Sequence, residues 1–143
     1  MATLRAFPFT LLTLIAFNIV ILASDPGVWG NDLFEVTLFS DVIWPLTNGD
    51  LMVTVGLLVL LIEVLRATTI HTKAITNHLV SVVVLIIYAI EFVVVEEAGN
   101  STFFILTMIA LVDVLAGIVV TIRLATRDFS VDRGAGGYPP FEQ

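Results

Sequence analysis

The sequence predicts an all-α integral membrane protein: a four-helix transmembrane bundle with an amphipathic outer segment between its first two helices. Two observations predict this class. Of the 143 residues, 58% are hydrophobic and 13% are charged, and a soluble domain of this size could not hide so much apolar surface from water. Hydropathy also separates four apolar stretches, each near the roughly 20 residues that a helix needs to cross a bilayer.

The predicted helices cover about residues 7–24, 49–69, 76–95 and 101–124, within one domain of residues 1–128. The first stretch follows Arg5 as the core of a signal peptide would. Its exit, VILASDPG, lacks a small residue three positions before either plausible cut, so we expect an uncleaved helix. Residues 129–143 are rich in Gly and Pro and predict a flexible cytoplasmic tail.

The basic residues set the predicted orientation. If the N-terminus is cytoplasmic, every Lys and Arg falls on the inner side, as the positive-inside bias requires: Arg5, Arg66, Lys73, Arg123, Arg127 and Arg133. The outer side then holds acids and no base: Asp25, Asp32, Glu35, Asp41, Asp50, Glu96 and Glu97. We therefore expect both termini in the cytoplasm, and the size and charge asymmetry favour a bacterial inner membrane.

The outer connection, residues 25–48, is too long for a minimal turn and mixes apolar residues with acids. This pattern predicts an amphipathic segment that lies on the outer interface or caps the bundle, with Trp29 and Trp44 at headgroup depth. The acids argue against tight binding to anionic lipid, so we expect the segment to pack over the helix ends. The 95–101 link is short, with Gly99 and Asn100 suited to positive φ and Ser101 suited to an N-cap, and it makes the third and fourth helices antiparallel neighbours.

The fourth stretch carries a single acid, Asp113, near its middle. An ionised carboxylate at that depth is costly, so its side chain should face protein or water and have a partner. At helical spacing, Asp113 shares a face with Ala110 and Gly117, and small residues let helices approach closely. On the second helix, Gly56 shares a face with Glu63. We expect the three small residues to form a packing seam.

Three further polar side chains fall within the predicted spans. Tyr88 and Glu91 belong to a polar stripe on the third helix, together with His78 and Ser81. At 1.5 Å per residue, Glu91 falls in the outer third of the membrane, Asp113 in the middle and Glu63 in the inner third. Asn18 on the first helix is expected at the depth of Asp113.

These residues allow two interpretations. Carboxylates spaced through a bundle, with Tyr88 between them, could relay protons or bind and release a cation. Alternatively, each is a polar contact between helices. The partners expected for that role are Arg66 or Arg123 for Glu63, and Asn18 or Thr107 for Asp113, with Glu91 reaching the outer interface.

No motif in the sequence supports enzymatic activity or a cofactor. His71 and His78 lack metal-ligand spacing, no Cys is present, and no pair of histidines lies deep enough on facing helices to hold a haem. Nucleophile elbows, phosphate loops and basic clusters for nucleic acid are missing as well.

The leading hypothesis is therefore an accessory or structural subunit of a larger membrane complex, with lipid and other membrane subunits or a second copy of the chain as partners. One alternative is an oligomeric channel or transporter coupled to protons or cations. A second is a membrane sensor that acts through its outer segment.

Overall fold

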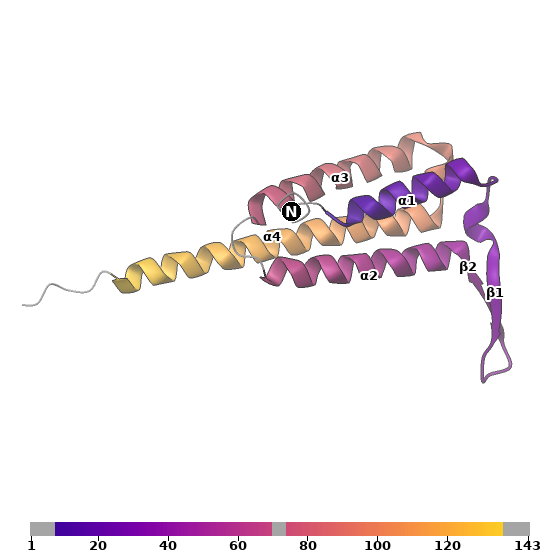
Figure 1. The fold of residues 1–143 in the computed structure, drawn as a ribbon, viewed down its shortest axis with the longest axis horizontal. Coiled ribbons are helices and arrows are strands. Elements are labelled where there is room, and N and C mark those ends of the chain that lie inside the picture. Colours follow the sequence, from indigo (N-terminus) through magenta and orange to yellow (C-terminus); the bar gives the residue numbers. More distant parts are fainter. Residues whose placement is uncertain (1–7, 70–73, 136–143) are drawn as a thin grey trace, which may run out of the picture.

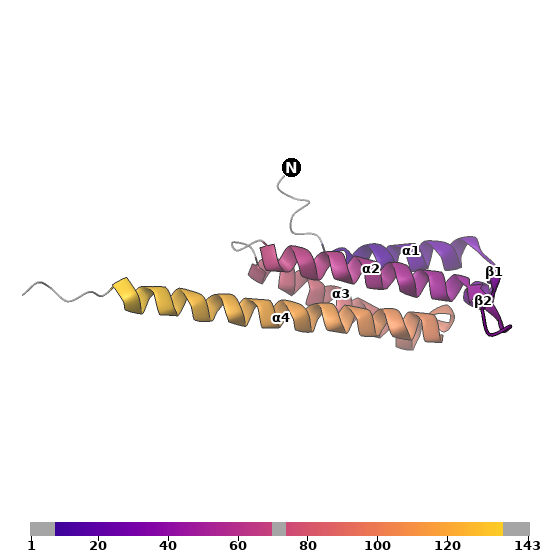
Figure 2. The same cartoon turned by 90° about the horizontal axis from the view of Figure 1, so that it is seen from below.

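The computed structural model describes residues 8–69 and 74–135, with side chains for residues 8–66 and 79–123. The chain is mostly helical: α1 is Thr10–Ala23, α2 is Asn48–Thr69, α3 is Ala74–Val94 and α4 is Ser101–Ala135. The four helices lie side by side along one long axis, and α4 extends past the others at one end (Figures 1 and 2). His71 and His78, and the part of the predicted tail after Ala135, lie outside the residues whose side chains the structure describes.

Among the residues whose side chains are described, two helical stretches are long and apolar enough to cross a membrane, Asn48–Arg66 within α2 and Ser101–Arg123 within α4. Shorter apolar helical stretches are Thr10–Ala23 and Leu79–Val94. Large apolar side chains on the outer faces of all four helices are exposed, for example Ile19, Leu58, Ile90 and Val119. An exposed apolar surface of this extent needs a non-aqueous neighbour.

Helix α1 is shorter than predicted. It has 14 residues, or about 21 Å at 1.5 Å per residue, instead of the expected 7–24. The helix ends at Ala23, and the backbone of the next residue, Ser24, is extended. Helix α4, in contrast, is longer than the predicted 101–124 and continues through the first part of the predicted tail to Ala135.

The connection between α1 and α2 is a β-hairpin, so the prediction of an all-α chain is wrong for this segment. Strand β1 (Asp32–Thr37) pairs antiparallel with β2 (Ile43–Thr47). The backbone closes through Leu38 and Val42, and Asp41 takes a positive φ of 59° between them, as three-residue hairpin loops often do. The run of β-branched and aromatic residues favours strands, and Pro45 is tolerated because a two-stranded ribbon has open edges.

The hairpin does not cap the helix ends. It projects across the long axis of the bundle and past α2, and β2 continues into α2 without a linker (Figure 1). The part of the connection that does pack on the bundle is the short 3-10 turn η2 (Val28–Gly30). There Trp29 is buried and stacks on Phe17 with ring centroids 4.6 Å apart, so its ring packs inside the bundle.

The α3–α4 connection is tight and makes the two helices antiparallel neighbours, as predicted (Figure 1). It contains the 3-10 turn η3 (Glu96–Ala98). Gly99 has a φ of −73°, so the expected positive φ is wrong there. The N-cap is Asn100 rather than Ser101, because the Asn100 side chain accepts the amide of Phe103 at 2.9 Å.

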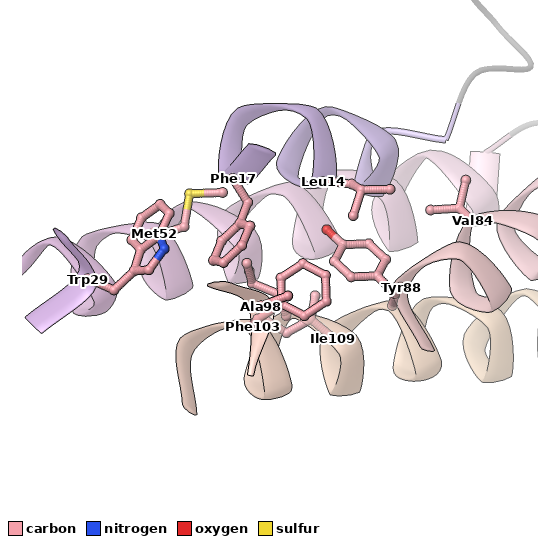
Figure 3. Packing of buried hydrophobic residues seen from close by; sticks show 11 residues of the cluster. Leu14, Phe17, Trp29, Met52, Val84, Tyr88, Ala98, Phe103 and Ile109 are labelled. Carbon is pink, nitrogen blue, oxygen red and sulfur yellow. The ribbon is translucent and has the colours of Figure 1, made fainter. Parts of the chain in front are cut away.

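The core lies in the half of the bundle nearest the hairpin. Aromatic side chains from α1, η2, α3 and α4 stack there in a layer that includes Phe17, Trp29, Tyr88 and Phe103 (Figure 3). Such ring contacts stabilise packing beyond the area that they bury. The hydroxyl of Tyr88 points out of this layer toward polar side chains further from the hairpin.

Candidate functional site

Polar side chains of three helices converge on the first turn of α1. The N-cap residue Phe9 makes no side-chain cap hydrogen bond, so the first amides of the helix need acceptors from elsewhere. Glu63 of α2 provides one: its Oε2 accepts the amide of Phe9 at 3.0 Å and the amide of Thr10 at 3.3 Å. A carboxylate also interacts favourably with the positive end of the helix dipole. Glu63 thus caps α1 from a neighbouring helix.

Asp113 of α4 binds the same turn from another side. Its Oδ2 accepts the Thr10 hydroxyl at 3.4 Å, and its side chain is 6% exposed, against 4% for Glu63. The two carboxyl groups are close enough to interact electrostatically. Helix α1 therefore starts between two buried acids.

The level of this cluster follows from helix lengths. At 1.5 Å per residue, Glu63 is about 22 Å from the start of α2, Asp113 about 18 Å from the start of α4 and Thr10 about 20 Å from the end of α1. These three helix ends lie together at the hairpin end (Figure 1). Glu63 and Asp113 thus lie at about the same level along the bundle. The residue count had placed Asp113 in the middle of the membrane and Glu63 in its inner third.

Tyr88 of α3 completes the cluster. It is fully buried and reaches from α3 toward α1 (Figure 3). Its hydroxyl lies 2.8 Å from the hydroxyl of Thr13 and donates to the Thr10 carbonyl at 3.3 Å, which also accepts the Thr13 hydroxyl at 2.7 Å. All four helices thus contribute to one hydrogen-bonded cluster around Thr10.

A second polar contact lies nearer the hairpin end. Asn18 Nδ2 donates to Glu91 Oε1 at 2.7 Å and to the Leu14 carbonyl at 3.1 Å. Both side chains are partly buried. The prediction that Asn18 lies at the depth of Asp113 is wrong, because α1 starts at Thr10 and Asn18 is about 12 Å further along the helix.

Of the three small residues expected to form a seam, Gly56 lies where two helices approach closely. A Cβ on Gly56 would come within 2.8 Å of Leu106 Cδ2 and 3.2 Å of Ile109 Cδ1 on α4. Ala110 is buried in the same helix, whereas Gly117 is partly buried and its carbonyl accepts the Thr121 hydroxyl at 2.9 Å. The close α2–α4 approach therefore depends most on Gly56.

Sequence reasoning missed Thr10 and Thr13, which are central to the cluster, and Gly49, where a Cβ would clash with Thr102 and approach the Trp29 carbonyl at 2.9 Å. A signal was present for the threonines, since residues three apart in a helix share one face. Nothing in the sequence marked Thr10 as the start of the helix, because apolar residues precede it.

Arg66 brings a basic group near the cluster, one turn after Glu63. Its guanidinium lies 4.3 Å from the ring centroid of Phe9, a distance that allows a cation–π contact, and its charge acts on Glu63. Among the described residues, no group of three or more His, Cys, Asp or Glu side chains is arranged to hold a metal ion.

Chemically, the cluster can hold a helix start inside an apolar bundle, and its carboxyl groups are of the type that can exchange a proton. No protein-family model matches the chain, and comparisons with curated proteins and with solved structures find no match. The function must therefore be argued from the site alone.

Proposed function

We propose that the chain is a non-enzymatic integral membrane protein, a four-helix transmembrane bundle that serves as an accessory or structural subunit of a larger membrane complex. The observation that carries this proposal is the use of the three interior acids. Glu63, Asp113 and Glu91 come from three different helices, and each hydrogen-bonds α1. Polar side chains that hydrogen-bond neighbouring helices hold a transmembrane bundle together, which is the work of a structural subunit.

The membrane location is supported by the burial pattern. Polar groups that bind α1 face inward, while the outer faces of the helices carry exposed Leu, Ile and Val. In hydrocarbon an unsatisfied backbone amide costs several kcal/mol, which explains why a helix that starts about 20 Å from the hairpin end needs a carboxylate cap.

The orientation is supported by the distribution of charge. Asp25, Asp50, Glu96 and Glu97 lie with the hairpin at one end of the bundle, and Arg66 and Arg123 lie toward the other. The positive-inside bias then puts the hairpin outside and both termini in the cytoplasm. A bacterial inner membrane is the setting that we propose.

The test of the subunit role is the size of the native particle. Membranes from cells that express the chain from its own locus are extracted in a mild detergent, and the particle is sized by native electrophoresis with a tagged copy as marker. We expect migration in a particle clearly larger than a detergent-bound monomer. Migration as a monomer across several mild detergents would contradict the proposal.

A second candidate function is a proton or cation relay formed by an oligomer. One observation favours it: Glu63 and Asp113 share Thr10 as a partner, and Glu63 Oε1 is buried without a hydrogen-bond partner among the described residues. In proteoliposomes, Asp113→Asn would then abolish flux that the wild-type chain supports. The matched variant Thr54→Val, which removes an exposed hydroxyl, would leave that flux intact. Absence of flux in the wild type would exclude the relay.

A further inference from the structure

The β-hairpin has one wholly apolar face. Residues directly opposite each other in an antiparallel pair point to the same side, and successive residues alternate. The pairs Phe34↔Leu46 and Val36↔Trp44 therefore share a face, and the next pair toward the tip is Leu38 with Val42, joined by a backbone hydrogen bond. We call these six residues the hairpin apolar face: Phe34, Val36, Leu38, Val42, Trp44 and Leu46.

The opposite side of the ribbon is mixed. It carries the pairs Glu35↔Pro45 and Thr37↔Ile43. The charged residues of the hairpin are Asp32, Glu35 and Asp41, and the segment contains no Lys or Arg. The hairpin is thus amphipathic and purely acidic, so an anionic surface would not attract it.

The hairpin apolar face lacks cover within the described part of the chain. Five of its six side chains are exposed, by 37% to 56%, and the neighbouring tip residue Phe39 is fully exposed. An isolated two-stranded hairpin is marginal in water, and six apolar side chains on one side would make it less soluble still. The face therefore needs an apolar neighbour.

The position of the hairpin identifies that neighbour. Strand β2 passes directly into α2, one of the two helices long enough to cross a membrane, and the other such helix starts at the same end. The hairpin extends across the helix axes and past the side of α2 (Figures 1 and 2). In a membrane-embedded bundle, it therefore runs parallel to the bilayer at the level where the spans begin, and continues the exposed apolar surface of Leu51, Val55 and Leu58.

We propose that the hairpin apolar face lies on the outer surface of the lipid bilayer beside α2 and anchors the bundle to the acyl boundary of a zwitterionic leaflet. This inference rests on the membrane location in the proposed function. Trp44 is suited to the role, because tryptophan favours the interface between headgroups and hydrocarbon. The acids of the opposite side then face water.

The chain has no Cys, so single cysteines can carry an environment-sensitive nitrobenzoxadiazole probe. The full-length protein is reconstituted in phosphatidylcholine vesicles with and without lipid that bears a nitroxide quencher near the headgroup end of the acyl chain. The probe is placed at Val42→Cys on the hairpin apolar face, at Glu35→Cys on the opposite side, and at Leu58→Cys on the exposed surface of α2.

We expect the lipid quencher to remove most of the emission from position 42 and little from position 35. Equal weak quenching at both hairpin positions, with strong quenching at position 58, would overturn the anchor while leaving the membrane location intact. Loss of quenching at position 58 as well would instead contradict the proposed function. Quenching at position 42 that falls as protein is added at constant lipid would show that a second copy covers the face, which also overturns the proposal.

Discussion

Thr10 is the residue on which the interior polar groups converge. Its amide binds Glu63, its hydroxyl binds Asp113, and its carbonyl accepts from Thr13 and Tyr88. A threonine serves here because it offers a hydroxyl to a neighbouring helix in addition to its backbone groups. A residue that composition would class as an ordinary interruption of an apolar run is thus the link between four helices.

Tyr88→Phe should weaken the bundle while preserving its shape. The substitution removes the hydroxyl that contacts Thr13 and Thr10 but keeps the ring that packs on Phe103. We expect a loss of about 1 kcal/mol in the free energy of unfolding, the usual scale for an interhelical hydrogen bond in a membrane protein. Reversible unfolding in mixed detergent and SDS micelles measures it.

The matched control for that measurement is Thr54→Val. The Thr54 hydroxyl donates to the Asp50 carbonyl of its own helix at 2.8 Å and is exposed, so its removal tests the effect of losing any hydroxyl. We expect this variant to stay within about 0.5 kcal/mol of the wild type, as surface changes do. Equal losses in the two variants would mean that Tyr88 does not join helices.

At the scale of elements, the close approach of α2 and α4 depends on a position without a side chain. Gly56 faces Leu106 and Ile109, and a glycine there lets the two helix backbones come together. The neighbouring face of α2, with Leu57 and Leu58, is exposed and makes no such demand. Within one turn of α2, position 56 therefore has no room for a larger side chain, whereas positions 57 and 58 do.

Gly56→Val should force α2 and α4 apart. The added branched side chain meets Leu106 and Ile109, and we expect destabilisation of about 1–3 kcal/mol, typical of overpacking. Gly56→Ala should cost less, because a single Cβ meets only the ends of flexible side chains. Leu57→Val, a change at an exposed position of the same helix, is the control. A Gly56→Val variant as stable as Leu57→Val would refute the close contact.

Helices were predictable from the sequence where an apolar stretch was long enough and polar or turn residues showed where it ended. Four helices and the α3–α4 hairpin follow from hydropathy and the short 95–101 link. The β-hairpin was missed, because alternation of apolar and acidic residues over a few positions fits an amphipathic interfacial segment as well as a strand. The pairing of β1 with β2 is a contact between segments, which periodicity within one segment cannot reveal.

The candidate site was predictable in its members but not in its geometry. Hydropathy marked Glu63, Glu91, Asp113 and Asn18 as exceptions within apolar runs. Their pairing depends on where α1 starts, and apolar residues before Thr10 hide that boundary. Because α1 starts at Thr10, Asp113 lies level with Thr10, and Asn18 lies level with Glu91.

At the scale of the whole molecule, α1 is the short member of the bundle and the other three helices hold it in place. Each contributes one acid to it, Glu63 and Asp113 at its first turn and Glu91 further along. The exposed surface is left to apolar side chains and to a hairpin that extends beyond the bundle. This division, polar contacts inside and apolar contacts outside, is what the membrane-subunit proposal explains.

The central claim is that a carboxylate from α2 holds the start of α1 inside the bundle, and amide hydrogen exchange tests it most directly. The amides of Phe9 and Thr10 donate to Glu63, whereas those of Leu11 and Leu12 donate to backbone carbonyls at 3.2 and 2.9 Å. The two pairs are adjacent in sequence, so the second pair is an internal reference.

With the protein in lipid nanodiscs, we expect slow exchange at Phe9 and Thr10, and acceleration of about tenfold or more at these two amides in Glu63→Ala, corresponding to about 1.4 kcal/mol of lost protection. Glu63→Gln, which keeps an acceptor oxygen, should stay close to the wild type. Fast exchange of both amides in the wild-type protein, or rates unchanged by Glu63→Ala relative to Leu11 and Leu12, would contradict the account.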